Sequence, residues 1–193
     1  RENFLHYLVQ DYVFLTHFSR AWALAVVKSE TLAEMKAAGA TVNGLVNGEM
    51  QLHIKICAEA GIPEEDLFTA TEEIGNMAYT RYVMDAGLSG DLADLLAALA
   101  PCVLGYGEIG ARLGQEAAPN TAYADWIATY AGDDYQKLCV DVGGLIDNAL
   151  ARRIGPDFTA SPRWAALTQR FVAATRLEVG FWDMGLAGPS TSA

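Results

Sequence analysis

The chain has 193 residues, a length that suits one domain with a substantial core. It is 52% hydrophobic and 19% charged, which excludes the disordered and low-complexity classes. The formal net charge is -11 and no run of lysines or arginines occurs, so we expect no nucleic-acid partner. An acidic chain suits neutral or cationic small molecules, although solubility accounts for most of these carboxylates.

The cysteines are Cys57, Cys102 and Cys139, widely spaced and without a CxxC pair. This pattern is neither a disulfide framework nor a zinc site, and it is typical of a reducing cytoplasm, where we place the protein. No uninterrupted apolar run approaches the ~18 residues of a membrane span, and no signal peptide is visible, so we expect no membrane partner. The chain starts at Arg1 already in helical pattern, and we expect a leader to precede it.

Helical periodicity recurs along the chain while strand-like alternation is nearly absent, which predicts an all-α protein. The first helix is predicted from about Glu2 to Val27. The second runs over residues 31–60 and is loosened by three glycines. A capping box of Thr69 and Glu72 is predicted to open a third helix that reaches about Asp85.

Ser89 is predicted to cap a fourth helix, which contains Pro101 and ends in the loop at residues 116–122. An element opens in the segment 123–130. Further helices are predicted over residues 134–153 and from Ser161 to Leu186, with Pro162 in the first turn. Residues 187–193 are expected to be a frayed tail. Short connections favour antiparallel neighbours, so residues 1–193 are predicted to form one compact helical bundle in a single domain.

The segment Pro101 to Gly110 holds the first candidate for chemistry, Cys102. A free cysteine is most often a buried small hydrophobe. Here, however, Pro101 removes the hydrogen bond to the carbonyl of Ala97. Tyr106 follows four residues after Cys102, so thiol and phenol share one helix face.

Two carboxylates fall on apolar helix faces. Asp11 lies on the stripe with Phe14, and it is either bound to a partner in the interior or turned to solvent at the edge of the stripe. Glu178 precedes Trp182 by four residues, where burial would raise its pKa toward neutrality and suit acid-base catalysis. The structural alternative for Glu178 is an ion pair with an arginine such as Arg176.

Several tyrosines either belong to the core or converge on a cavity that stacks a flat heterocycle. These are Tyr79, Tyr82, Tyr106, Tyr123 and Tyr130.

A metal site is not expected. Glu49 and His53 are four residues apart, whereas di-iron bundles use Glu-x-x-His, which the chain lacks. A structural hydrogen bond between Glu49 and His53 is the preferred interpretation. A haem would need an axial histidine, and none of the three histidines has supporting context.

Taken together, the segments 4–22, 47–62, 78–110, 123–135 and 178–185 resemble the TenA family, or thiaminase II, in the order of that family. The resemblance covers nearly the whole chain and implies a haem-oxygenase-like bundle, usually a homotetramer, without a cofactor. It also implies hydrolysis of C–N bonds in pyrimidine products of thiamin degradation, giving hydroxymethylpyrimidine for thiamin salvage, with cleavage of thiamin itself as a second activity.

The resemblance assigns roles to matching residues. Cys102 is expected to be the nucleophile, Glu178 the proton donor and Tyr79 the phenol that hydrogen-bonds the sulfur. Asp11 is expected to grip the amidine edge of the pyrimidine. The remaining substrate-binding residues are expected to be Tyr106, Tyr130 and Phe14.

Phe14 departs from the pattern, because some family members carry a tyrosine there that assists the sulfur. We expect Cys102 to have a higher thiol pKa, or to attack more slowly, than in a relative with that tyrosine.

Two alternatives remain open. One is an oxidase on the same fold, similar to the enzyme of pyrroloquinoline-quinone synthesis. The other is a regulatory protein that binds thiamin or a pyrimidine without turnover.

Overall fold

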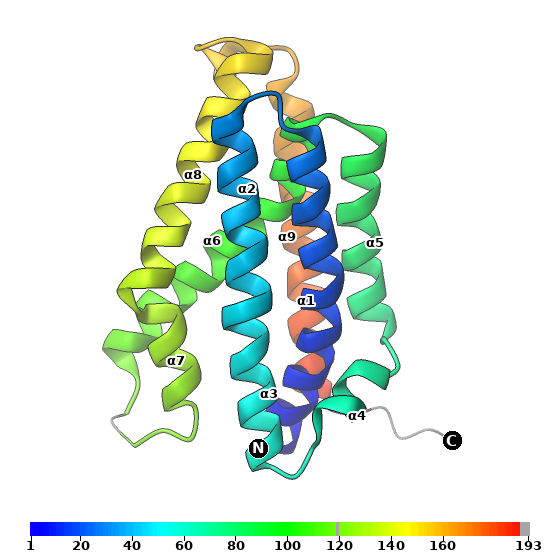
Figure 1. The fold of residues 1–193 in the computed structure, drawn as a ribbon, viewed down its shortest axis with the longest axis vertical. Coiled ribbons are helices and arrows are strands. Elements are labelled where there is room, and N and C mark those ends of the chain that lie inside the picture. The colour runs from blue at the N-terminus through cyan, green and yellow to red at the C-terminus, as the bar shows by residue number, and fades with distance from the viewer. Residues whose placement is uncertain (119, 190–193) are drawn as a thin grey trace.

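The computed structural model describes residues 1–118 and 120–189, which form a bundle of helices (Figure 1). No strand occurs within these residues, as the all-α prediction requires. Helix α1 spans Glu2–Lys28 and matches its predicted bounds closely. Its apolar stripe includes Leu8, Leu15 and Trp22, all of them buried.

The second predicted helix is continuous in the structure but contains an irregular turn in its middle. Helix α2 spans Leu32–Gly44, a π-helical turn η1 spans Leu45–Glu49, and α3 spans Met50–Glu59. Thr31 caps α2 through a capping box with Glu34. A π turn holds one residue more than an α turn, so η1 changes the direction in which the following side chains point.

The start of the third predicted helix was wrong. The chain forms a short helix α4, Glu64–Thr69, in which Thr69 is the last residue rather than a cap. Its hydroxyl donates to the carbonyl of Glu65, and Glu72 receives Arg81 instead of closing a capping box. Helix α5, Ile74–Ser89, begins after the extended residue Glu73.

The predicted cap of the fourth helix was also wrong. Ser89 ends α5, and α6, Leu92–Glu116, is capped by Asp91, whose carboxylate accepts from the amides of Ala93 and Asp94. Pro101 lies inside α6. By length and composition α6 could cross a membrane, although charged residues interrupt its apolar sequence. In the bundle, however, 67% of its most apolar 18-residue stretch is buried. It is therefore a core helix.

Helix α7 spans Ala124–Ala131, α8 spans Asp133–Ile154, a 3₁₀ turn η2 spans Phe158–Ala160 and α9 spans Trp164–Ala187. Helix α9 starts three residues later than predicted, because Pro162 lies in the turn before it. Residue 119 of the predicted loop and residues 190–193 of the predicted tail lie outside the described residues.

Helices α1 and α6 carry the core between them. Helix α6 runs obliquely behind α1 and α2 in Figure 1 and packs against α5, α7, α8 and α9. Helix α1 packs against α2, α3, α5, α6 and α9. The side chains that fill the centre include Trp22, Tyr79, Tyr130 and Phe181, each at most 1% exposed.

Candidate functional site

Asp11 is the buried carboxylate of α1, 2% exposed, and it is bound inside the bundle rather than turned to solvent. Its Oδ2 accepts from the hydroxyl of Tyr7 at 3.1 Å and from His53 Nε2 at 2.6 Å. Among the described residues no hydrogen bond reaches Oδ1. The protein thus uses one carboxylate oxygen and leaves the other as an acceptor.

His53 on α3 is fully buried and is hydrogen-bonded at both ring nitrogens. Its Nδ1 lies 2.9 Å from the carbonyl oxygen of Glu49, which can only accept. Burial alone would lower the pKa of His53, but the hydrogen bond and charge of Asp11 outweigh it, so the pKa is raised. The preferred interpretation of Glu49 and His53 as a hydrogen-bonded pair is confirmed, through the backbone of Glu49 rather than its carboxylate.

A network of phenols joins Asp11 to α6 and α7. The Tyr7 hydroxyl gives its hydrogen to Asp11, so it accepts from Tyr106 at 3.2 Å and from the indole of Trp126 at 3.3 Å. The ring of Tyr106 lies 5.0 Å from that of Tyr130. The predicted binding residues Asp11, Tyr106 and Tyr130 are therefore gathered in one cluster.

Glu49, at the end of η1, adds a second carboxylate to this cluster. The hydroxyl of Tyr130 donates to its Oε1 at 2.5 Å. Burial, followed by the charge of Asp11, raises the pKa of Glu49 to about 7.

Cys102 lies on α6 directly after Pro101 and shares its face with Tyr106. It is 5% exposed. Burial raises the pKa of its thiol well above the ordinary value, and the charges of Glu178, Glu49 and Asp11 add to the rise. The resting thiol is neutral, so attack requires a partner that removes its proton.

Buried polar atoms without a protein partner come from α5 and α9. Among the described residues no hydrogen bond of normal geometry reaches the hydroxyl of Tyr79, Glu178 Oε2 or the indole nitrogen of Trp182. Tyr79 and Trp182 nevertheless lie close enough to Glu178 to lower its pKa against the effect of burial. No arginine pairs with Glu178 among the described ion pairs. Burial raises the pKa of Glu178 to about 8, so the group holds its proton at pH 7. Unpartnered buried groups are rare in native proteins, and they are expected where a ligand completes their bonding.

Phe14 packs in the middle of this aromatic region. Its ring lies 5.0 Å from Tyr79 and 5.4 Å from Phe181. It supplies no hydrogen bond, so the hydroxyl of Tyr79 has no phenolic neighbour at this position.

Sequence reasoning missed Tyr7 and Trp126, and it did not connect His53 with Asp11. Tyr7 precedes Asp11 by one helical turn, a spacing that could have signalled the hydrogen bond. His53 and Trp126 are brought in only by the packing of α3 and α7, and no local pattern marks them. Among the described residues no group of three or more His, Cys, Asp or Glu side chains is placed to hold a metal.

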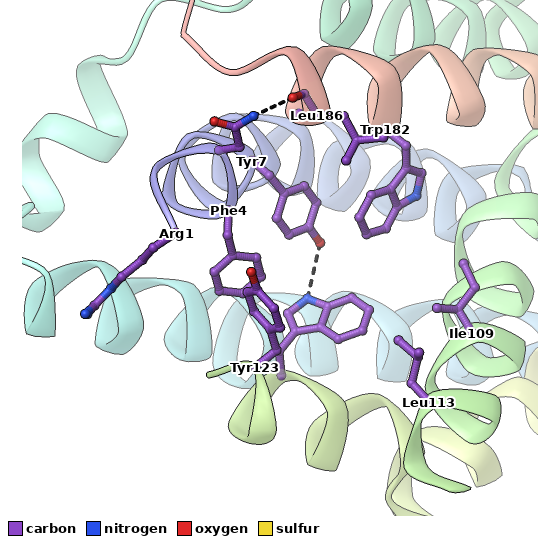
Figure 2. Close-up of a pocket in the computed structure, with 11 residues that line it drawn as sticks. Arg1, Phe4, Tyr7, Ile109, Leu113, Tyr123, Trp182 and Leu186 are labelled. Atoms are coloured by element: carbon purple, nitrogen blue, oxygen red, sulfur yellow. Dashed lines mark hydrogen bonds between the residues drawn. The ribbon is translucent and has the colours of Figure 1, made fainter. Parts of the chain in front are cut away.

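A cavity of about 420 Å³ lies beside the cluster, at the end of the bundle that holds the N-terminus. Figure 2 shows the rings of Phe4, Tyr7 and Trp182 around it. Tyr7 and Trp182 stack at 4.8 Å. They separate this apolar cavity from Asp11 and Tyr106, which do not line it.

The fold and the cluster define a haem-oxygenase-like, TenA-type helical bundle. A solved structure described as a TenA family transcription regulator from Silicibacter sp. TM1040 superposes with a TM-score of 0.93 and is 67% identical, covering 96% of this chain and 82% of that one.

The model of the TENA/THI-4/PQQC family matches residues 1–188, and the chain therefore belongs to that family. An uncharacterized protein of Haemophilus influenzae is 41% identical over 185 residues, covering 95% of this chain and 83% of that protein. The aminopyrimidine aminohydrolase of Halalkalibacterium halodurans is 31% identical over 186 residues, covering 95% of this chain and 80% of the enzyme.

Proposed function

We propose that the protein is an aminopyrimidine aminohydrolase with thiaminase II chemistry. It hydrolyses the C–N bond of pyrimidine products of thiamin degradation and yields hydroxymethylpyrimidine for thiamin salvage. The observation that carries the proposal is the set of unpartnered buried groups, Tyr79 and Glu178, beside a buried cysteine. The name of the Halalkalibacterium halodurans relative supports the substrate class.

The geometry suits acid-assisted covalent catalysis. Glu178, protonated at pH 7, donates to a ring nitrogen of the pyrimidine, which makes a ring carbon electrophilic. The thiol of Cys102 passes its proton to the exocyclic amine and bonds to that carbon. Asp11, through its free oxygen, accepts from the amidine edge of the ring and fixes its orientation.

The remaining steps restore the enzyme. Ammonia leaves from the exocyclic carbon, and the double bond formed there takes up water to give the alcohol. Breaking of the S–C bond then returns the aromatic ring, while Glu178 regains its proton from the ring nitrogen and the sulfur takes up the proton that the added water released. The buried hydroxyl of Tyr79, near both Glu178 and Cys102, would donate a hydrogen bond to the sulfur when it carries charge.

Ammonia release from aminomethylpyrimidine tests this function. The purified protein should release ammonia, and Cys102→Ser should reduce the rate at least about 100-fold, since a hydroxyl is a far weaker nucleophile than a thiol here. Cys57→Ser, a buried cysteine on α3, is the matched control and should retain activity. Equal rates for wild type and Cys102→Ser would defeat the mechanism.

A regulatory role is the second candidate, because the relative from Silicibacter is described as a transcription regulator. The net charge of -11 disfavours direct contact with DNA. Tight binding of hydroxymethylpyrimidine without turnover of any aminopyrimidine would favour this candidate over the enzyme.

A further inference from the structure

Glu49 lies at the end of the irregular turn η1, on the inward-facing side of the helix. Leu45, Glu49, His53 and Cys57 follow one another at a spacing of four, and all but Glu49 are fully or almost fully buried. The amide of Met50 donates to the carbonyl of Leu45, as expected for a π turn. Such turns are rare and occur frequently at functional sites. Glu49 is thus a carboxylate on the face of this helix that is otherwise buried.

Glu49 is the acid of the cluster whose carboxylate has no directly bonded cation among the described residues. Asp11 bonds directly to His53, whereas His53 acts on the Glu49 carboxylate only through its charge, and Glu178 holds its own proton. Tyr130 gives Glu49 a neutral hydrogen bond to Oε1 only. Among the described residues no lysine or arginine pairs with Glu49, and Oε2 has no hydrogen bond. An ionised Glu49 in this position is therefore stabilised by any cation that enters the site.

The position of Glu49 relative to the reacting groups can be read from their shared neighbours. Its partner Tyr130 packs 5.0 Å from Tyr106, which follows Cys102 by one turn of α6. Burial and the charge of Glu178 are the main causes that raise the pKa of the Cys102 thiol. The charge of Glu49 is the next cause, ahead of the charge of Asp11. Glu49 is thus linked to the region of the thiol through Tyr130 and Tyr106, while Asp11 is tied to α1 and α3 by Tyr7 and His53.

We propose that Glu49 binds the exocyclic amine of the substrate as an ammonium ion and selects substrates with a cationic leaving group. The inference rests on the proposed function. Asp11 then holds the amidine edge of the pyrimidine and Glu49 the opposite, reacting end. There the Glu49 carboxylate accepts one proton of the ammonium, so that the nitrogen can take up the proton of the Cys102 thiol, and Glu49 returns its proton to the departing ammonia. After hydrolysis the ammonium is replaced by a neutral hydroxyl, which loses the charge-assisted contact, so the product is released more readily than the substrate.

Two substrates that differ in this charge test the proposal. Aminomethylpyrimidine carries an ammonium group, whereas its N-formyl derivative is neutral at the same atom. In Glu49→Gln the KM for aminomethylpyrimidine should rise about 10- to 100-fold, as expected for loss of a hydrogen bond between charged groups. The KM for the formyl derivative should change less than about threefold. Glu108→Gln, the same substitution at an exposed position of α6, is the control.

Each outcome separates the inference from the function on which it rests. An equal effect of Glu49→Gln on both substrates would overturn the inference and leave the function intact. If the wild type releases no ammonia, the function fails. Calorimetry then measures the Kd of aminomethylpyrimidine and of hydroxymethylpyrimidine for the wild type and for Glu49→Gln. The inference holds if the substitution raises the Kd for aminomethylpyrimidine about 10- to 100-fold and changes the Kd for hydroxymethylpyrimidine less than about threefold. Absence of binding to either compound would overturn both. If Glu49→Gln does not fold, Glu49→Asp, which keeps the charge but withdraws it, should show a smaller loss restricted to aminomethylpyrimidine.

Discussion

Glu178 combines two properties that a proton donor needs, burial and the absence of a cationic partner. Because burial favours the neutral form, its pKa of about 8 places the protonated acid in the majority at physiological pH. Cys102 is subject to the same burial, which keeps the thiol neutral. The two groups therefore rest in their neutral forms, and charge develops only when a substrate accepts a proton.

A pH series of stability tests this state of Glu178. Its folded pKa lies above its unfolded value of 4.5, so its contribution to stability is complete below pH 4.5 and is lost as the pH rises to about 8. In Glu178→Gln the decline of the free energy of unfolding over this window should be shallower by up to about 1.4 kcal/mol per pH unit. Denaturant titrations at pH 5 to 8 measure it. Glu108→Gln is the control, and parallel curves for wild type and Glu178→Gln would contradict the assignment.

Phe14 affects the environment of the Cys102 sulfur because it has no hydroxyl group, unlike the tyrosine that some family members carry there. We expect Phe14→Tyr to supply a hydroxyl near Tyr79, to stabilise the thiolate of Cys102 and to speed its alkylation at a given pH. Alkylation rates across pH 7 to 10 in the two proteins measure the effect, with Cys102→Ser as the background. Identical profiles would show that the lost phenol has no influence on the thiol.

Among the elements, α6 depends on a glycine for its close contact with α7. A Cβ at Gly110 would lie 2.5 Å from the backbone carbonyl carbon of Tyr130, so α6 and α7 can approach each other only because this residue has no side chain. Gly105, on the same helix, has no atom within 4 Å of that position.

These two glycines give a matched pair of substitutions. Gly110→Ala should lower the free energy of unfolding by about 1–3 kcal/mol through overpacking, and it should reduce activity by displacing Tyr130 from Glu49. Gly105→Ala should raise stability by about 0.5–1 kcal/mol, because alanine is the better helix former. Thermal unfolding and ammonia release measure both effects. Equal behaviour of the two variants would show that α7 yields to the added methyl group.

The helical segments could be predicted from periodicity, whereas their exact starts could not. Thr69 and Ser89 have the residue types of caps, but each ends a helix and bonds back to its own turn. The true cap Asp91 lies two residues beyond Ser89. The π turn cannot be recognised from the hydrophobic spacing. The spacing of Glu49 and His53 raised only the question of a metal site, and no local pattern connects His53 with Asp11. Contacts between distant helices decide such roles.

At the scale of the whole molecule, exposed apolar side chains occur on α5 and α9. Ile74 is 85% exposed, Leu186 71% and Val179 55%. We expect a homotetramer that covers part of this surface. Light scattering should give four times the chain mass of 20.7 kDa, and Ile74→Glu should lower the measured mass if α5 lies in the interface. A mass equal to one chain at micromolar concentration would contradict the tetramer.

The candidate site draws its side chains from α1, η1, α3, α5, α6, α7 and α9, so its parts come from nearly the whole chain. Asp11 and Glu178 in particular belong to the first and last helices, which pack together. No fragment of the chain assembles these groups, and the closure of such a long loop comes late in folding. Catalytic activity should therefore return during refolding only with the last cooperative step, after helical circular dichroism has recovered.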